Sequence, residues 1–126
     1  MTATQFIIGA GAQDLTWLDD DIDENSQIIY PGPCVLTGYM LTNASSTVRA
    51  FLKLYDSASV VNLVTDYQLL KAYFGIPKGQ SANVSFPRGI LFSSGLVIAA
   101  SGAAGVADAT PLATQALGGT ILYKPV

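Results

Sequence analysis

Val48-Arg49-Ala50-Phe51-Leu52-Lys53-Leu54-Tyr55-Asp56 decides the fold class, because small or aliphatic side chains alternate in it with long, charged or aromatic ones. Successive side chains of a β-strand point to opposite faces, so this period of two predicts a strand with one face in a core. We expect Val48, Ala50, Leu52 and Leu54 to point inward, and Arg49 and Lys53 to point outward. In later segments of the same kind, we expect Val84, Phe86, Leu96 and Ile98 to point inward and Lys124 to point outward.

Related apolar segments recur along the chain, separated by Gly- or Pro-rich turns at intervals of about ten residues. This spacing predicts an all-β chain: a jelly-roll-like antiparallel β-sandwich of eight or nine strands in a single domain. The competing immunoglobulin-like sandwich typically pairs two cysteines around a core tryptophan, whereas Cys34 is the only cysteine here. The expected strands are residues 5–8, 28–30, 35–43, 48–56, 69–76, 82–86, 90–92, 96–100 and 119–124.

Acidic residues are concentrated near the N-terminus, where six of the nine lie between Asp14 and Glu24. A block of like charge is typical of a solvated loop or arm. We therefore expect residues 1–27 to form an N-terminal arm that packs on the domain or extends from it, and residues 28–126 to form the sandwich. Trp17 stands in this acidic segment and is the expected aromatic anchor of the arm on a neighbouring surface. The candidate contact residues of the arm are Trp17, Asp19, Asp20 and Asp21.

The chain is poor in charge: Asp, Glu, Lys and Arg make up 12% of its residues, and hydrophobic residues make up 50%. Such a surface suits contact with other protein, and we expect a homo-oligomer. The stretch 102–118 is rich in small side chains that permit close approach, with Ala103, Ala104 and Val106 as contact candidates. The net charge of −3 disfavours a nucleic-acid partner. Residues 89–107 are divided by Ser93-Ser94-Gly95 into strand-length pieces, which disfavours a membrane span.

No motif for catalysis, cofactor or metal is complete in the sequence. Histidine is absent, and the Gly-x-Gly start at Gly9 lacks the third glycine of a dinucleotide site. Asp19, Asp21 and Asp23 have the spacing of the first ligands of a calcium loop, but the required later ligands are missing. Paired carboxylates for glycoside cleavage could come from Asp56, Asp66 and Asp108, although turn-forming aspartates are common at such positions. We therefore expect no enzyme activity and no cofactor.

Four pieces of the sequence follow one another in a recognisable order: Leu52–Asp56, Gly75–Gly79, Val84–Ala99 and Gly119–Lys124. From about Leu41 to the C-terminus the chain resembles small structural proteins encoded among the virion genes of tailed bacteriophages, often capsid decoration (cement) proteins. The resemblance implies a jelly-roll-like subunit of the virion, made in the cytoplasm of the host bacterium and bound to the major capsid protein or other virion subunits. It also favours a trimer, because a cyclic trimer matches the local threefold points of a capsid. It carries no active-site residues.

Two functions remain open. The first is a decoration subunit that stabilises the assembled head by binding between capsid subunits. The alternative is a recognition module of a tail or fibre that binds host-surface carbohydrate or receptor, since jelly rolls also serve as lectins. Its candidate sugar platforms are Tyr39, Tyr55, Tyr67 and Tyr73.

Overall fold

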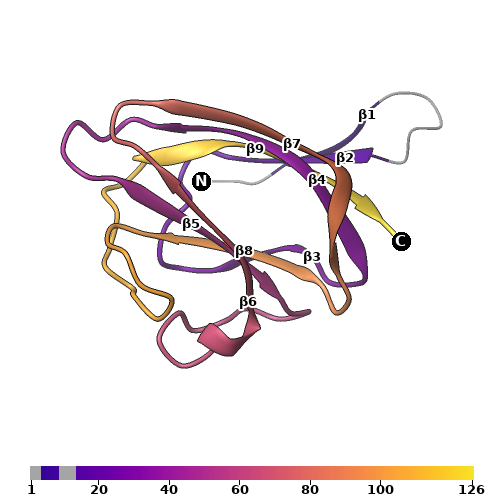
Figure 1. The fold of residues 1–126 in the computed structure, drawn as a ribbon. Coiled ribbons are helices and arrows are strands. Elements are labelled where there is room, and N and C mark those ends of the chain that lie inside the picture. The colour runs from indigo at the N-terminus through magenta and orange to yellow at the C-terminus, as the bar shows by residue number, and fades with distance from the viewer. Residues whose placement is uncertain (1–3, 9–13) are drawn as a thin grey trace.

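The computed structural model describes residues 4–8 and 14–126, and these form nine β-strands and one short turn of 3-10 helix, η1, at Tyr67–Leu69 (Figure 1). The expectation of an all-β chain is confirmed. The strands are β1 (Thr4–Ile8), β2 (Asp14–Asp19), β3 (Gln27–Tyr30), β4 (Cys34–Asn43), β5 (Ala50–Asp56), β6 (Leu70–Ile76), β7 (Ser81–Phe92), β8 (Leu96–Ser101) and β9 (Leu117–Pro125).

The strands form two antiparallel sheets packed as a β-sandwich, with the orders β1-β2-β9-β4-β7 and β3-β8-β5-β6. Figure 1 shows the five-stranded sheet above the four-stranded one. From β2 onward the pairing is nested, since β2 pairs with β9, β3 with β8, β4 with β7, and β5 with β6. These pairs alternate between the two sheets, so the chain runs as one long double ribbon that folds over the core.

The core fills the space between the sheets, and the alternating stretch of the sequence supplies its centre. Ala50, Leu52 and Leu54 are fully buried, as predicted, and Leu96 and Ile98 of β8 lie against them. Val84 and Phe86 of β7 are half-buried and pack on the same cluster. Val48 is 38% exposed and precedes the strand, so the expectation that it points inward is wrong.

A second layer covers the outer face of the four-stranded sheet. All six residues of β8 are buried, which requires cover on both faces of the strand. Outside the sheet, Tyr55, Val97 and Ala99 pack with Val61 and Leu63 of the loop that follows β5. Arg49 and Lys124 are exposed as predicted, but Lys53 is fully buried, because a local period of two does not reveal that a loop covers the outer face.

The turn expected at Pro87-Arg88-Gly89 is an irregularity inside one long strand, β7, rather than a break between two strands. Leu36 pairs with Ile90 and Gly38 with Ser85, so four residues of β7 lie opposite Thr37 alone. Gly89 has φ +72°, and a Cβ added there would lie 2.0 Å from Cγ1 of Val35. The extra residues therefore bulge from the edge of the sheet, and glycine permits the close approach.

Within the segment expected to be an N-terminal arm, residues 4–8 and 14–19 are strands of the sandwich. Residues 14–19 form β2, which lies between β1 and β9 within the five-stranded sheet. The boundary expected after residue 27 does not separate an arm from the sandwich, because residue 27 is already the first residue of β3 (Gln27–Tyr30). The acidic residues that follow β2 cross from one sheet to the other.

Candidate protein-contact surface

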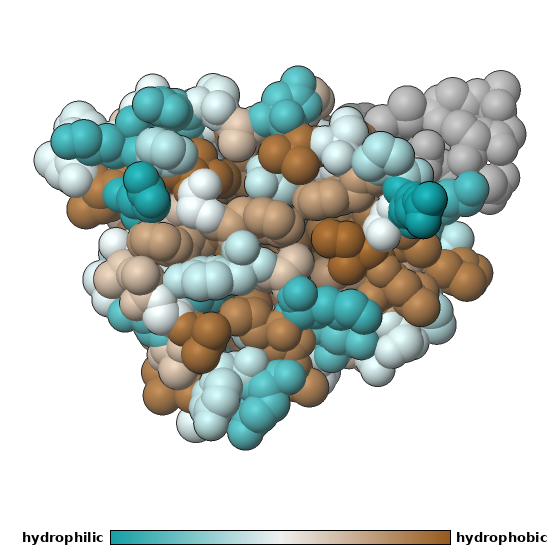
Figure 2. Space-filling model, viewed as in Figure 1, coloured by the Kyte–Doolittle hydropathy of each residue, from teal (hydrophilic) through white to brown (hydrophobic). Residues whose placement is uncertain are grey.

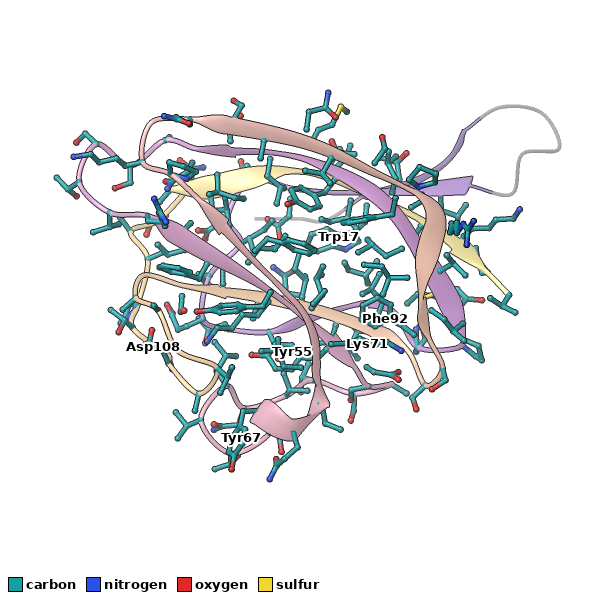
Figure 3. The ribbon with its side chains drawn as sticks, viewed as in Figure 1. Trp17, Tyr55, Tyr67, Lys71, Phe92 and Asp108 are labelled. Carbon is teal, nitrogen blue, oxygen red and sulfur yellow. The ribbon has the colours of Figure 1, made fainter. Side chains whose placement is uncertain are left out.

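Trp17 is not an exposed anchor. Its side chain is 2% exposed and belongs to the core cluster, because β2 pairs with β9 in a register that sets Trp17 beside Ile121. Figure 3 shows the indole between the two sheets. Asp19 is also buried, and its carboxylate accepts hydrogen bonds from the backbone N–H of Asp21, at 2.8 Å, and from Nε2 of Gln27. The role of Trp17 as a contact residue on the surface is therefore wrong.

The acidic segment beyond β2 is tied to the long loop that precedes β9. Oδ1 of Asp21 accepts the backbone N–H of Gln115 at 2.9 Å, and the N–H of Ile22 donates to the carbonyl of Leu117 at 2.8 Å. The carbonyl of Asp23 accepts the N–H of Ala100. Asp20 is exposed, so this fixed segment presents negative charge to the surroundings.

The long loop is held against the outer face of the four-stranded sheet by Lys53. Nζ of Lys53 donates to the carbonyl of Gly105 at 2.8 Å and to that of Asp108 at 2.6 Å, and lies 5.8 Å from the ring centre of Tyr73. The hydroxyl of Tyr73 accepts the N–H of Gly105. Burial lowers the pKa of Lys53, and the nearby charge of Asp108 acts in the opposite direction.

The contact candidates of this loop are largely accessible. Ala103 is half-buried, Ala104 is exposed, and Val106 is 50% exposed. The loop thus carries small side chains at the surface on a backbone that Lys53 and Tyr73 fix. Local periodicity could not have identified these two residues, because the partners lie more than thirty positions away in the chain.

The three carboxylates considered for glycoside cleavage accept hydrogen bonds from residues of turns and loops. Asp66 accepts the N–H of Asn62, and Asp108 accepts both the N–H and the hydroxyl of Thr110. Asp56 accepts the N–H of Ser94 at 2.8 Å and the hydroxyl of Ser93 at 3.0 Å. These hydrogen bonds make the three carboxylates local stabilisers of loops.

The pH dependence of Asp56 follows from these hydrogen bonds. Partial burial alone would raise its pKa, but the bonds from Ser94, Ser93 and Gly95 outweigh it and hold the pKa below the usual 3.8. As the pH falls, the unfolded chain therefore binds a proton at Asp56 before the folded chain does. The stability that Asp56 contributes is present above pH 3.8 and is lost as the pH falls through the pKa of Asp56 in the folded protein. We expect Asp56→Asn to lower the free energy of unfolding at pH 7 and to lower it by less near pH 2. Urea unfolding of both proteins at the two pH values measures this, and an equal difference at both would contradict it.

The described part of the chain contains no group of three or more His, Cys, Asp or Glu residues that could hold a metal ion. Cys34 is buried at the start of β4, and burial, with a contribution from the charge of Asp56, raises the pKa of its thiol to about 11. A thiol in this state is a packing residue rather than a nucleophile.

An apolar seam lies where the edge strands β6 and β7 meet. We define the seam as Phe74, Ala82, Val84, Phe86 and Ile90, all half-buried on the core cluster. Tyr39 packs beneath it, with ring centres 5.4 Å from Phe74 and 6.2 Å from Phe86, and these two rings are 5.7 Å apart. Figure 2 shows apolar side chains across the middle of this view, between the two layers. The sequence identified Phe86 as a core residue but could not show that β7 is an edge.

The outer face of the five-stranded sheet adjoins the seam and is uncharged over most of its area. Its side chains alternate with the core residues of β4, β7 and β9. Thr42 and Ser81 are hydrogen-bonded across the strands at 2.8 Å. The residues of this neutral face are Met40, Thr42, Ser81, Asn83, Ser85, Thr120 and Leu122.

Among the described residues, no helix has the length and apolar character needed to cross a membrane. The stretch 89–107, considered above for a span, instead contains the end of β7 and all of β8. Comparisons of the chain with protein-family models, with curated proteins and with solved structures find no match.

Proposed function

We propose that this chain is a virion structural protein, a capsid decoration subunit of a tailed bacteriophage that binds between capsid subunits as a homotrimer. The observation that carries the proposal is the seam together with the neutral face beside it. Half-buried aromatic and aliphatic side chains lie there next to a sheet surface that is uncharged over most of its area. Surfaces of this kind mark sites of protein contact.

The nested strand pairing supports the same proposal. The pairs alternate between the two sheets, from β2·β9 at the ends of the ribbon to β5·β6 at its fold, and this order supports the jelly-roll topology that we propose. This architecture occurs in viral capsid and lectin domains. Fold alone does not assign function, so the contact surface carries the greater weight.

The mechanism is stabilisation by binding to the assembled state. The seam and the neutral face of the subunit would be covered only when it binds between assembled capsid subunits. Its binding would therefore lower the free energy of the complete shell, but not that of the separate capsid subunits. Exposed loop residues such as Ala104 and Val106 would add close contacts at its margin.

Imaging of particles tests this function directly. We expect electron microscopy of virions to place the subunit on the head, and heads that lack it to lose their contents at lower temperature or lower salt than complete heads. Location on the tail, or equal resistance of both kinds of head, would overturn the proposal.

A recognition module is the second candidate, favoured by one part of the surface. Tyr39 and Tyr55 are buried and cannot form sugar platforms, but Tyr67 is 43% exposed and Tyr73 36%. Next to Tyr67 in the chain, Asp66 lines a shallow groove with Glu24 and Asn62. Polar groups beside an exposed ring are the components of a sugar site. Binding in a glycan array that Tyr67→Ala abolishes would favour this function, and location on the head would oppose it.

A further inference from the structure

The charges of the chain are separated along the sequence. Residues 1–48 contain six acidic and no basic residues, whereas residues 67–92 contain three basic and no acidic residues. The three basic residues are Lys71, Lys78 and Arg88, all exposed, on β6, on the following turn and on β7.

The fold converts this separation into two opposite sides of the sandwich. β6 and β7 are edge strands at the same side, one in each sheet, and β6 contacts β7 across the seam. β3 is the opposite edge of the four-stranded sheet, and the acidic segment 20–24 connects it to β2 at the far side of the five-stranded sheet. One side is therefore basic and the other acidic.

The basic side is also the side that carries the half-buried apolar seam. Nζ of Lys71 reaches the ring of Phe92, 5.8 Å from its centre, and Figure 3 shows the two side chains together. Arg88 stands on the bulge of β7, where it lines a shallow hollow with Phe86 and Ile90 of the seam. A partner that fits this side offers acidic groups around an apolar contact.

The acidic side of a second copy meets that requirement. Asp20 is exposed, and Asp21, Asp23 and Glu24 are half-buried on a backbone tied to β8 and β9. Ile28 of β3, on the same side, is 38% exposed. We infer that copies of the chain associate head to tail, with the basic seam side of one copy against the acidic side of the next.

This inference rests on the self-association included in the proposed function and specifies its geometry. A contact between two different surfaces is heterologous, the type from which cyclic rings such as trimers are built. The charges set the orientation, because two seam sides or two acidic sides would repel each other.

Charge reversal on each side tests the contact. The seam variant is Lys71→Glu with Arg88→Glu, and the acidic-side variant is Asp20→Lys with Glu24→Lys. Of the latter residues only Asp20 has a side-chain bond, from Nε2 of Gln115 at 3.4 Å, so the local fold keeps its shorter hydrogen bonds. We expect each variant to self-associate at least about tenfold more weakly in sedimentation velocity. The variant with all four substitutions should recover association.

The variant with all four substitutions is also the control for net charge, because it keeps the wild-type value of −3. Far-UV circular dichroism verifies that each variant is folded. If both reversals leave the oligomer intact, or if the four substitutions together fail to restore it, the head-to-tail contact is overturned but the virion role is not. A wild-type chain that stays monomeric at high concentration overturns the self-association itself.

Discussion

Leu52→Ala should lower the free energy of unfolding by about 2–5 kcal/mol, the range for large-to-small changes in a core. The side chain of Leu52 is fully buried, with 0% of its surface exposed to solvent. It pairs in register with Phe74 of β6 and Ala100 of β8, so its side chain lies at the centre of the four-stranded sheet. The close packing around it cannot collapse fully into the space left by the side chain.

Leu91→Ala is the matched control, since Leu91 is on β7 but 50% exposed. Urea unfolding followed by circular dichroism should show a loss within about 0.5 kcal/mol for this variant. Equal losses for Leu52→Ala and Leu91→Ala would contradict the assignment of the core between the sheets.

Lys53→Met should release the long loop from the sheet. Methionine fills a similar volume but donates no hydrogen bond, so the carbonyls of Gly105 and Asp108 lose their partner. A buried polar group without a partner costs about 1–3 kcal/mol, and these carbonyls can recover hydrogen bonds by moving into water. We expect fast amide hydrogen exchange and new proteolytic cleavage between residues 102 and 110, together with a lower free energy of unfolding.

The control for this prediction is Lys71→Met, which removes the same charge from an exposed position of β6. Its loop should keep the exchange protection of the wild type. If Lys53→Met also leaves protection of the loop unchanged, Tyr73 and the other loop contacts suffice and Lys53 does not hold the loop.

The sheets could be predicted from sequence where alternation is strong. Residues 50–56, 70–76 and 96–101 repeat apolar positions with a period of two or remain apolar throughout, and all are strands. β2 was missed because Asp14 and Asp19 frame it and more acids follow. The signal was present in Leu15-Thr16-Trp17-Leu18, whose side chains favour a strand.

The candidate site was less predictable, because it depends on which strands become edges and which faces are covered. The alternation correctly places Leu52 and Lys53 on opposite faces of β5. Lys53 is nevertheless buried like Leu52, because the loop that precedes β9 docks on its face of the sheet. Likewise, Phe86 has the same local pattern whether β7 is central or at an edge. Such properties arise from pairings between distant segments, which local sequence does not encode.

The bulge of β7 has a consequence for the behaviour of the protein in bulk. A straight edge strand offers free N–H and C=O groups on which strands of other molecules can add, and repeated addition ends in fibrils. Pro87 has no N–H to offer, Arg88 places a charge at the edge, and Gly89 turns the backbone out of its extended course. Strand addition along this edge is therefore interrupted at residues 87–89, and a continuous ribbon along the whole length of β7 is blocked.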